Sequence, residues 1–208
     1  EKGYEVYAAC ANTGGFSEEQ LKTNEENAYK LGAVKYVTLD VTQEYYEKSL
    51  KYMVFGNVLR NGTYPISVSS ERIFQALAIA RYANEIGADA IAHGSTGAGN
   101  DQIRFELAIK ALAPDINIIA PWRNEKWTLD SREAEIEYCK QHGIHLPFSA
   151  DTSYSRDRNL WHISHEGLEL EDPANEPNYK HLLVLGNSPE EAPEEGEYVT
   201  MTFEEGVP

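Results

Sequence analysis

The chain has 208 residues, of which 41% are hydrophobic and 25% charged, so it is long enough to bury a core as one or two domains. Its formal net charge of -16 argues against nucleic acid as a partner, because such binding depends on Lys and Arg contacts with phosphates. No run of 18 apolar residues is present, which excludes a membrane-spanning helix from the sequence. Cys10 and Cys139 are far apart and lack metal-type spacing, so we expect them to be small core residues in a reducing cytoplasm.

The N-terminal part of the chain predicts a strand, a helix and a second strand. An apolar run from Tyr4 to Ala11 predicts the first strand, and the polar residues 12–15 predict a loop after it. The segment that begins Ser17-Glu-Glu-Gln is typical of a capping box that opens a helix, which we expect to end before Gly32. Residues 34–39 predict the second strand.

The middle of the chain continues this alternation. We expect Thr42 to cap an acidic helix, Ser69 or Ser70 to begin a long helix through Glu85, and Ser131 to cap a later helix. The other predicted elements are strands at 88–92 and 116–120 and a helix at 102–112. Strands that alternate with helices predict an α/β fold with a parallel sheet covered by helices on both faces. A ligand is then expected at the carboxyl ends of the strands.

A glycine-rich turn connects the strand at 88–92 to the next helix. Residues 94–100 contain three glycines and a polar cluster, and Arg104 follows within the helix. Unpaired N–H groups at a helix N-terminus favour phosphate or carboxylate, so this turn predicts an anion-binding site. A glycine-rich turn is also an ordinary tight connection in any α/β domain, and this alternative stays open.

The character of the chain changes after residue 146. Polar runs, Trp161 and several prolines follow, and an alternating segment at 197–203 predicts a half-buried strand. Between them, the glutamates of residues 190–197 predict a solvated loop. We therefore expect a nucleotide-binding α/β domain at 1–146 and the start of an α+β domain at 147–208.

Several other chemistries are poorly matched by the sequence. His162, His165 and Glu166 suggest a zinc site, but known zinc patterns need different spacing and a further ligand. No Gly-x-Ser-x-Gly elbow and no Walker-type Gly-x4-Gly-Lys-Ser/Thr loop occur. These observations argue against a zinc enzyme, an α/β-hydrolase and a P-loop enzyme.

Three motifs resemble those of the argininosuccinate synthase family. The run Gly-Ser-Thr-Gly-Ala-Gly-Asn-Asp-Gln-Ile-Arg-Phe-Glu at 94–106 resembles the family signature, although the family usually has lysine at the position of Ala98. The segment from Tyr64 to Arg72 is similar in spacing to the family's Tyr-Leu-Leu-Gly-Thr-Ser-Leu-Ala-Arg. Residues 151–167 look like a further signature, and the resemblance extends over the whole chain.

The resemblance implies a fold and an activity. The fold is the adenine nucleotide α-hydrolase-like domain of ATP pyrophosphatases, followed by part of an α+β synthetase domain. The activity is ligation of citrulline and aspartate to argininosuccinate in arginine biosynthesis and the urea cycle. ATP activates citrulline as citrullyl-AMP with release of pyrophosphate, and aspartate displaces AMP. Mg²⁺ would accompany the phosphates, and the family forms cytoplasmic homotetramers.

The resemblance also implies site residues, each with a plainer structural alternative. Ala11 could be only a small residue at a strand end, Tyr64 a capping aromatic and Ser69 an N-cap. Ser155 and Ser164 could be ordinary surface serines. The implied contacts are Ala11 and Gly94 for ATP, Thr96, Asn100 and Asp101 for aspartate, and Tyr64, Ser69, Asn100, Arg104, Ser155 and Ser164 for citrulline.

One departure from the family affects the expected activity. The family begins with a strand and a Ser-Gly-Gly-x-Asp-Thr-Ser loop that grips pyrophosphate, and no such loop occurs here. Loss of that strand would leave its neighbours unpaired, so we expect a fragment that does not turn over substrate alone. The alternatives are a noncatalytic domain that retains a nucleotide or amino-acid pocket, and another ATP pyrophosphatase.

Overall fold

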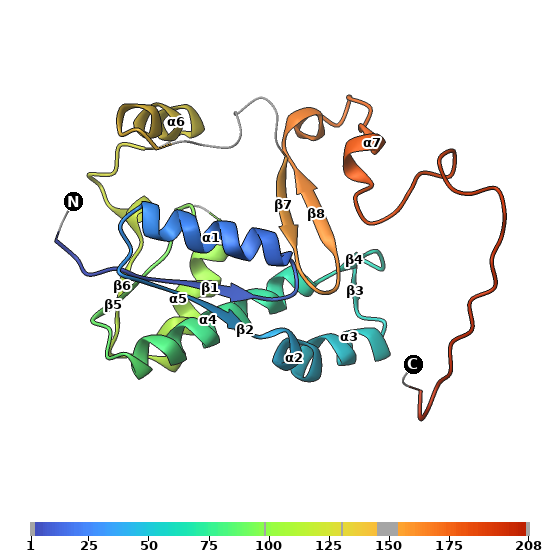
Figure 1. Ribbon diagram of the computed structural model, residues 1–208, viewed down its shortest axis with the longest axis horizontal. Helices are drawn as coiled ribbons and strands as arrows, with labels where there is room; N and C mark the ends of the chain where they lie inside the picture. Colours follow the sequence, from blue (N-terminus) through green and yellow to red (C-terminus); the bar gives the residue numbers. More distant parts are fainter. Residues whose placement is uncertain (1–2, 98, 130, 145–153, 207–208) are drawn as a thin grey trace. The chain divides into compact units, whose positions relative to one another are not determined.

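The computed structural model describes residues 3–97, 99–129, 131–144 and 154–206 (Figure 1). The chain divides into two compact units, Glu1–His165 and Glu166–Pro208. Ala98 and the first three residues of the expected 151–167 signature lie outside the described residues. So does the expected domain boundary after residue 146, which stays a prediction.

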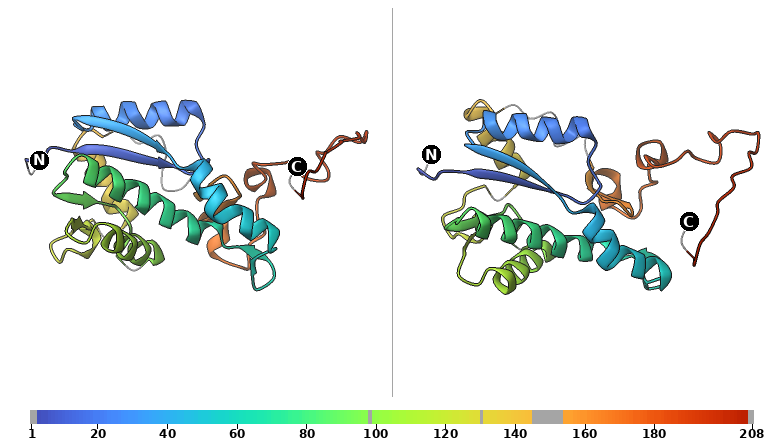
Figure 2. Two further views of the ribbon diagram at one scale, coloured as in Figure 1. Left: turned by 90° about the horizontal axis from the view of Figure 1, so that it is seen from below. Right: turned by 60° about the horizontal axis from the view of Figure 1, so that its bottom comes forward.

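The first strand pair confirms the elements expected in the N-terminal part of the chain. Strand β1 (Tyr7–Asn12) pairs in parallel with β2 (Lys35–Asp40), and α1 (Glu18–Lys30) connects them. Ser17 forms the expected capping box, in which its hydroxyl accepts from the Gln20 N–H and the Gln20 side chain accepts from the Ser17 N–H. Figure 2 shows α1 over one face of this strand pair and α4 (Ser67–Glu85) against the other.

A second parallel pair follows the long helix α4. Strand β5 (Ala90–Ala92) pairs with β6 (Asn117–Ile119), and α5 (Asn100–Leu112) connects them. Parallel strands joined by helices confirm the α/β class. The expectation of one continuous sheet is wrong for the described residues, because β1–β2 and β5–β6 are separate two-stranded sheets.

Helix α4 is buried on two faces because it packs in two separate cores. Its small residues at helical spacing allow close approach of the neighbouring elements. One core joins α4 to α5 and β5–β6, and it contains Ala76, Ala80, Ala83, Ile91, Ile109, Ala113 and Ile116. The other core joins α4 to the segment after β2, and it contains Val41, Tyr45, Leu50, Phe74 and Ala78. These contacts fix the position of the α4 N-terminus, where the candidate site lies.

Two expected helix starts differ from the observed ones. Val41, and not Thr42, is the N-cap of α2 (Thr42–Tyr45), because the Asp40 carboxylate already accepts from the Thr42 N–H and hydroxyl. Helix α4 begins at Ser67, so Ser69 is its third residue and not its N-cap. The hairpin of β3 (Leu59–Arg60) and β4 (Tyr64–Pro65) leads into α4, with left-handed φ of 54° and 73° at Asn61 and Gly62 in its turn.

Shorter elements complete the two units. Ser131 caps α6 (Arg132–Gln141) as expected, by accepting from the Ala134 N–H. The other elements are a π-helical turn (Tyr46–Leu50), α3 (Lys51–Phe55), a 3-10 turn (Pro121–Arg123), β7 (Ser155–Arg158), β8 (Ile163–Glu166), a 3-10 turn (Leu168–Glu171) and α7 (Tyr179–Leu182).

The strand expected at 197–203 is wrong. This segment of the second unit has no strand assignment, and Tyr198 and Val199 are exposed. The alternation of its apolar residues therefore does not correspond to a buried face in the chain as described. Among the described residues, no helix is both long and apolar enough to cross a membrane.

Candidate functional site

The candidate site lies where the carboxyl ends of β1 and β5 meet the beginnings of α4 and α5. Thr13, directly after β1, donates from its hydroxyl to the Glu71 carboxylate of α4 at 2.6 Å. Arg72 of α4 donates from Nε to Oδ2 of Asp101, in the first turn of α5, at 2.9 Å. The end of β1 and both helix starts are thus tied together by side chains, at the edge where an open α/β fold binds its ligand.

Arg72 is the central cation of the site. Arg72 is only 9% exposed, and its Nη2 donates to Oδ1 of Asp157 on β7 at 2.7 Å. Nη1 lies 3.4 Å from both Glu71 Oε2 and Gln75 Oε1. Burial lowers the pKa of Arg72, but the hydrogen bond that it donates to Asp101 and the charges of Asp157 and Glu71 outweigh burial, so the pKa of Arg72 is raised. The guanidinium is therefore held as a permanent charge among three carboxylates.

Glu71 is the central acceptor of the site and is only 2% exposed. Its carboxylate accepts from Thr13 as described, from Gln75 Nε2 at 2.9 Å and from Asn159 Nδ2 at 2.9 Å. Burial raises the pKa of Glu71, against the hydrogen bonds from Thr13 and Asn159 and the charge of Arg72, which lower it. A buried carboxylate with this many donors joins the end of β1, α4 and the β7–β8 turn.

Three of the expected substrate contacts are brought together next to Arg72. Arg104 donates from Nη1 to Asp101 Oδ1 at 2.8 Å and from Nη2 to the Ser69 hydroxyl at 2.9 Å. Both oxygens of Asp101 thus face guanidinium groups, one from Arg72 and one from Arg104. Burial raises the pKa of Asp101, but the hydrogen bonds and charges of Arg72 and Arg104 outweigh it and hold this pKa below its usual range. Asp101 is therefore an ionised carboxylate at neutral pH.

The β7–β8 hairpin presents one face to the start of α4. Tyr154 packs edge-on against His165 at 5.9 Å between ring centroids, which places these two residues on one face. By the alternation of side chains along a strand, Ser155, Asp157 and Ser164 lie on the opposite face, which carries the Asp157 contact with Arg72. The structure thus directs the two expected serines toward the same side as the Arg72 contact.

The turn of the hairpin is also fixed against α4. The Ser67 hydroxyl is hydrogen-bonded to Nδ1 of His162, and Tyr64 packs edge-on against the His162 ring at 5.8 Å. Burial lowers the pKa of His162, against the charge of Asp157, so a neutral imidazole is favoured. Because His162 and His165 are engaged with different partners on a strand and its turn, they do not form the paired helical face that a zinc site would need.

The loop after β1 packs closely against this turn. The Leu160 N–H donates to the Thr13 carbonyl at 2.8 Å. A Cβ on Gly15 would lie 2.0 Å from the carbonyl oxygen of Arg158, and Gly14 has a left-handed φ of 89°. Only glycine permits this approach of two backbones without displacement. The polar run 12–15 therefore positions the hairpin, a role that the sequence pattern did not indicate.

The glycine-rich turn is open at Gly94 but closely packed further along. An added Cβ would lie 3.1 Å from the Trp122 carbonyl oxygen at Gly97 and 2.8 Å from the Thr96 hydroxyl oxygen at Gly99. An added Cβ on Gly94 would meet no atom within 4 Å, and Thr96 and Asn100 are exposed. Gly99, the N-cap of α5, donates its N–H to the Thr96 carbonyl at 3.2 Å. Gly94 thus leaves open space shortly before the N-terminus of α5, where the partial positive charge favours an anion.

The two remaining expected contacts lie at the margin of this cluster. Ala11 is half-buried near the end of β1, opposite Leu39 of β2, and packs against the Val41–Tyr45–Phe74 core. Tyr64 is exposed on β4 and reaches the site through its contact with His162. Of the expected residues, Ser69, Asp101 and Arg104 therefore form a bonded cluster next to Arg72, and the others lie around it without a bond to this cluster among the described contacts.

Sequence reasoning missed the buried residues that hold the cluster together. Arg72 stood inside the family-like segment from Tyr64, but no role followed from its spacing. Glu71 lies three residues before Phe74 and seven before Ala78, so helical spacing places it on the buried face of α4 and could have identified it. Asp157 carried no signal, because an acidic residue in a short polar strand is typical of a solvated surface.

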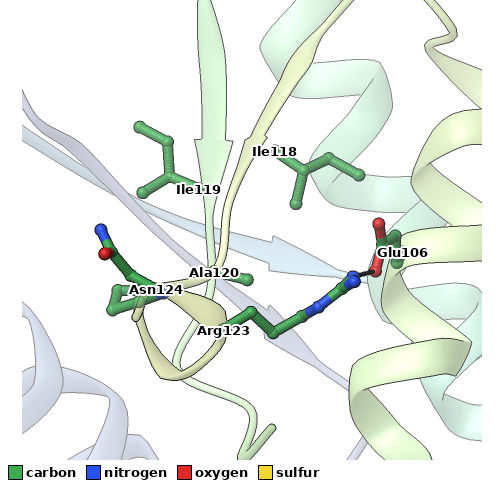
Figure 3. Close-up of a pocket in the computed structure, with 7 residues that line it drawn as sticks. Glu106, Ile118, Ile119, Ala120, Arg123 and Asn124 are labelled. Atoms are coloured by element: carbon green, nitrogen blue, oxygen red, sulfur yellow. Dashed lines mark hydrogen bonds and ion pairs between the residues drawn. The ribbon is translucent and has the colours of Figure 1, made fainter. Parts of the chain in front are cut away.

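A pocket of about 430 Å³ lies at the carboxyl end of β6. Figure 3 shows Arg123 reaching across it to Glu106, below Ile118 and Ile119. None of the expected substrate contacts is among the residues that line it.

The described residues do not fit a metal site built by protein side chains. Within residues 3–97, 99–129, 131–144 and 154–206, no group of three His, Cys, Asp or Glu side chains is arranged to hold a metal ion. Asp101 and Asp157 are directed at guanidinium groups instead.

Two family models match this chain. Residues 1–145 match the arginosuccinate synthase N-terminal HUP domain, and residues 154–208 match the arginosuccinate synthase C-terminal domain. The HUP match agrees with the parallel strand pairs and covering helices of the first unit.

Curated proteins from several bacteria are similar over nearly the whole chain. Argininosuccinate synthases of Lachnospira eligens, Agathobacter rectalis and Lachnoclostridium phytofermentans are 60%, 57% and 54% identical over 99% of this chain. The chain spans about half the length of these relatives, since the matches cover 50% of each of them.

Proposed function

The chain belongs to the argininosuccinate synthase family, and we propose that it forms the part of such a ligase that positions aspartate and citrulline. In the proposed reaction, citrulline is activated by ATP as citrullyl-AMP, pyrophosphate leaves, and the amine of aspartate displaces AMP. The observation that carries the proposal is the bonded group of Ser69, Asp101 and Arg104 at the start of two helices.

Aspartate is proposed to bind at the first turn of α5. Asp101 is ionised and uses one oxygen for each arginine, which leaves further lone pairs that can accept from the substrate ammonium group. Thr96 and Asn100 lie on the same turn with exposed side chains, which suits hydrogen bonds to a carboxylate. This arrangement would hold the attacking amine in a fixed place, which is the main contribution that positioning makes to a two-substrate reaction.

Citrulline is proposed to bind between α4 and the β7–β8 hairpin. Ser155 and Ser164 share the hairpin face that carries Asp157, and Ser69 and Arg104 lie on the helix side. Hydroxyl donors and a guanidinium suit the carboxylate end of an amino acid, and Tyr64 and Asn100 would complete the set.

ATP is proposed to bind at the carboxyl ends of β1 and β5. Ala11 offers a small side chain beside the base, and the Gly94 backbone has open space in front of it for the phosphates. The N–H groups at the start of α5 would stabilise phosphate charge. Mg²⁺ remains a proposal as a companion of the phosphates, and the cytoplasmic homotetramer remains one for the whole protein.

The test is AMP release from ATP in the presence of citrulline and aspartate, by the protein that contains this chain. We expect Asp101→Ala and Arg104→Ala each to reduce AMP release by about a hundred-fold or more, because each removes a charged group aimed at a substrate. Arg81→Ala, on the exposed side of α4, is the control and should match the parent. Equal activity of all four proteins would refute the site assignment.

A binding measurement separates the second candidate function. If the parent binds citrulline or ATP but releases no AMP, a noncatalytic nucleotide- or amino-acid-binding role is supported in place of ligation.

A further inference from the structure

One buried side chain connects the three elements that carry the proposed substrate contacts. Arg72 projects from the second turn of α4 and contacts Asp101 at the start of α5 and Asp157 on the hairpin. These partners are 29 and 85 residues away in the sequence. A single guanidinium thus ties the proposed aspartate side of the site to the proposed citrulline side.

We infer that Arg72 is a positioning residue, which sets the distance between the two amino-acid substrates by fixing α5 and the β7–β8 hairpin to α4. The inference rests on the proposed function, because it concerns the same two substrates. It goes beyond that function by assigning a role to a residue that has no proposed substrate contact.

The directions of its hydrogen bonds support a positioning role and not substrate binding. All three nitrogens of Arg72 face protein acceptors: Nε faces Asp101, Nη2 faces Asp157, and Nη1 lies between Glu71 and Gln75. Arg104 differs, because its side chain is 30% exposed against 11% for Arg72. Arg104 also donates to Asp101 and Ser69, but its greater exposure leaves its guanidinium accessible to a ligand, whereas Arg72 is buried among protein acceptors.

The planar fork of arginine is necessary for this role. Asp101 and Asp157 accept from different nitrogens of one planar guanidinium, Nε and Nη2, so their relative positions are set by its rigid geometry. A lysine ammonium supplies the same charge at a single flexible point and cannot fix two carboxylates in the same way. Arg72→Lys therefore keeps the positive charge at this position but removes the planar guanidinium that fixes the two carboxylates.

The Asp157 contact is the link that concerns the hairpin alone. Asp157 lies on the hairpin face that also carries Ser155 and Ser164, so its ion pair with Arg72 sets how far these serines stand from α4. Asp157→Asn weakens this link and leaves the bond between Arg72 and Asp101 intact. The two variants should therefore affect the two substrates differently.

The experiment measures KM for citrulline, aspartate and ATP, and kcat, in the protein that contains this chain. We expect Arg72→Lys to raise KM for both citrulline and aspartate about ten-fold, because small displacements of bound reactants are costly, and to leave KM for ATP within about two-fold. Asp157→Asn should raise KM for citrulline by a similar factor and leave KM for aspartate within about two-fold. Because the two variants break the same link to the hairpin, their effects on citrulline KM should be less than additive when combined.

Arg81→Lys is the matched control, because Arg81 lies on the same helix and forms an exposed ion pair with Glu44. It should leave all three KM values at the parent level. The inference is overturned if Arg72→Lys lowers the melting temperature but leaves both amino-acid KM values unchanged. It is also overturned if Asp157→Asn raises the KM of aspartate as much as that of citrulline.

The outcome distinguishes this inference from the proposed function. A parent protein without citrulline- and aspartate-dependent AMP release would refute the proposed function itself. An active parent whose Arg72→Lys and Asp157→Asn variants keep parental KM values would refute only the positioning role. If Arg72→Lys fails to fold, the KM values of Asp157→Asn alone test the positioning role, because this variant keeps the buried guanidinium in place.

Discussion

The start of α4 and the glycine-rich turn before α5 belong to one site but are built in opposite ways. At the start of α4, Glu71 and Arg72 are buried and bonded to side chains from β1, α5 and the β7–β8 hairpin. In the turn, Gly94 and Thr96 are exposed, and an added Cβ on Gly94 meets no atom. The start of α4 uses its polar groups in contacts within the protein, while the turn has open space at Gly94.

The difference shows how a small-molecule site can be both rigid and open. Buried charged groups with several partners fix the positions of the elements, because each is costly to leave unpaired. The start of a helix carries partial positive charge that favours an anion, and the open space at Gly94 leaves room for one. We therefore expect substitutions at the start of α4 to affect stability most, and substitutions in the turn to affect ligand binding most.

The largest effect is expected for Glu71→Leu. This change removes the acceptor of Thr13, Gln75 and Asn159 and leaves Arg72 without one of its carboxylates, so it should lower the free energy of unfolding by about 3–5 kcal/mol. Glu71→Gln keeps the shape and one acceptor oxygen and should cost about 1–3 kcal/mol. Urea unfolding followed by circular dichroism measures both values. A Glu71→Leu protein as stable as the parent would show that the buried network is not what fixes this region.

A pair of glycine substitutions compares the two regions directly. Gly15→Ala places a methyl group 2.0 Å from the Arg158 carbonyl oxygen and should cost about 1–3 kcal/mol through displacement of the hairpin. Gly94→Ala meets no atom within 4 Å and should change stability by less than about 0.5 kcal/mol. The same unfolding measurement tests both. If Gly94→Ala is the more destabilising of the two, the contrast between a packed and an open loop is wrong.

The stabilising contribution of Asp101 should depend on pH. Its pKa in the folded chain is lower than the ordinary 3.8, because the hydrogen bonds and charges of Arg72 and Arg104 outweigh burial. The unfolded chain therefore takes up a proton at Asp101 at higher pH than the folded chain does. The contribution is fully present above 3.8 and is lost as the pH falls through the lower, folded pKa.

Comparison with Asp101→Asn measures this contribution. The difference in urea midpoint between parent and variant should be constant from pH 7 to about pH 5 and should shrink at lower pH. A difference that grows on acidification would contradict the proposed ion pairs of Asp101.

The smallest effect is expected for Arg81→Gln. Arg81 lies on α4 like Arg72, but its side chain is 57% exposed and, among the described residues, it forms an ion pair with Glu44. Exposed ion pairs contribute little because water solvates the separated charges, so the cost should be below about 1 kcal/mol. A larger loss of stability would mean that the difference in exposure between Arg81 and Arg72 does not determine how much each contributes to stability.

The sequence by itself determined the local structure and the family-like motifs. The capping box at Ser17, the cap at Ser131 and the helix after the glycine-rich turn were predictable, because caps and helical periodicity depend on residues only a few positions apart. The alternating segment at 197–203 was the counterexample, because alternation predicts a strand only where a second surface covers one face.

Only the tertiary structure decided that Arg72 joins Asp101 to Asp157 and that Glu71 joins Thr13 to Asn159. These partners come from four different elements, and they meet because two cores hold α4 between the strand pairs. No sequence pattern predicts these contacts. The residues on either side of a polar residue in the sequence are the same whether its side chain is buried or exposed to solvent. The physical reason is that burial of a charge is set by packing of distant segments, not by local periodicity.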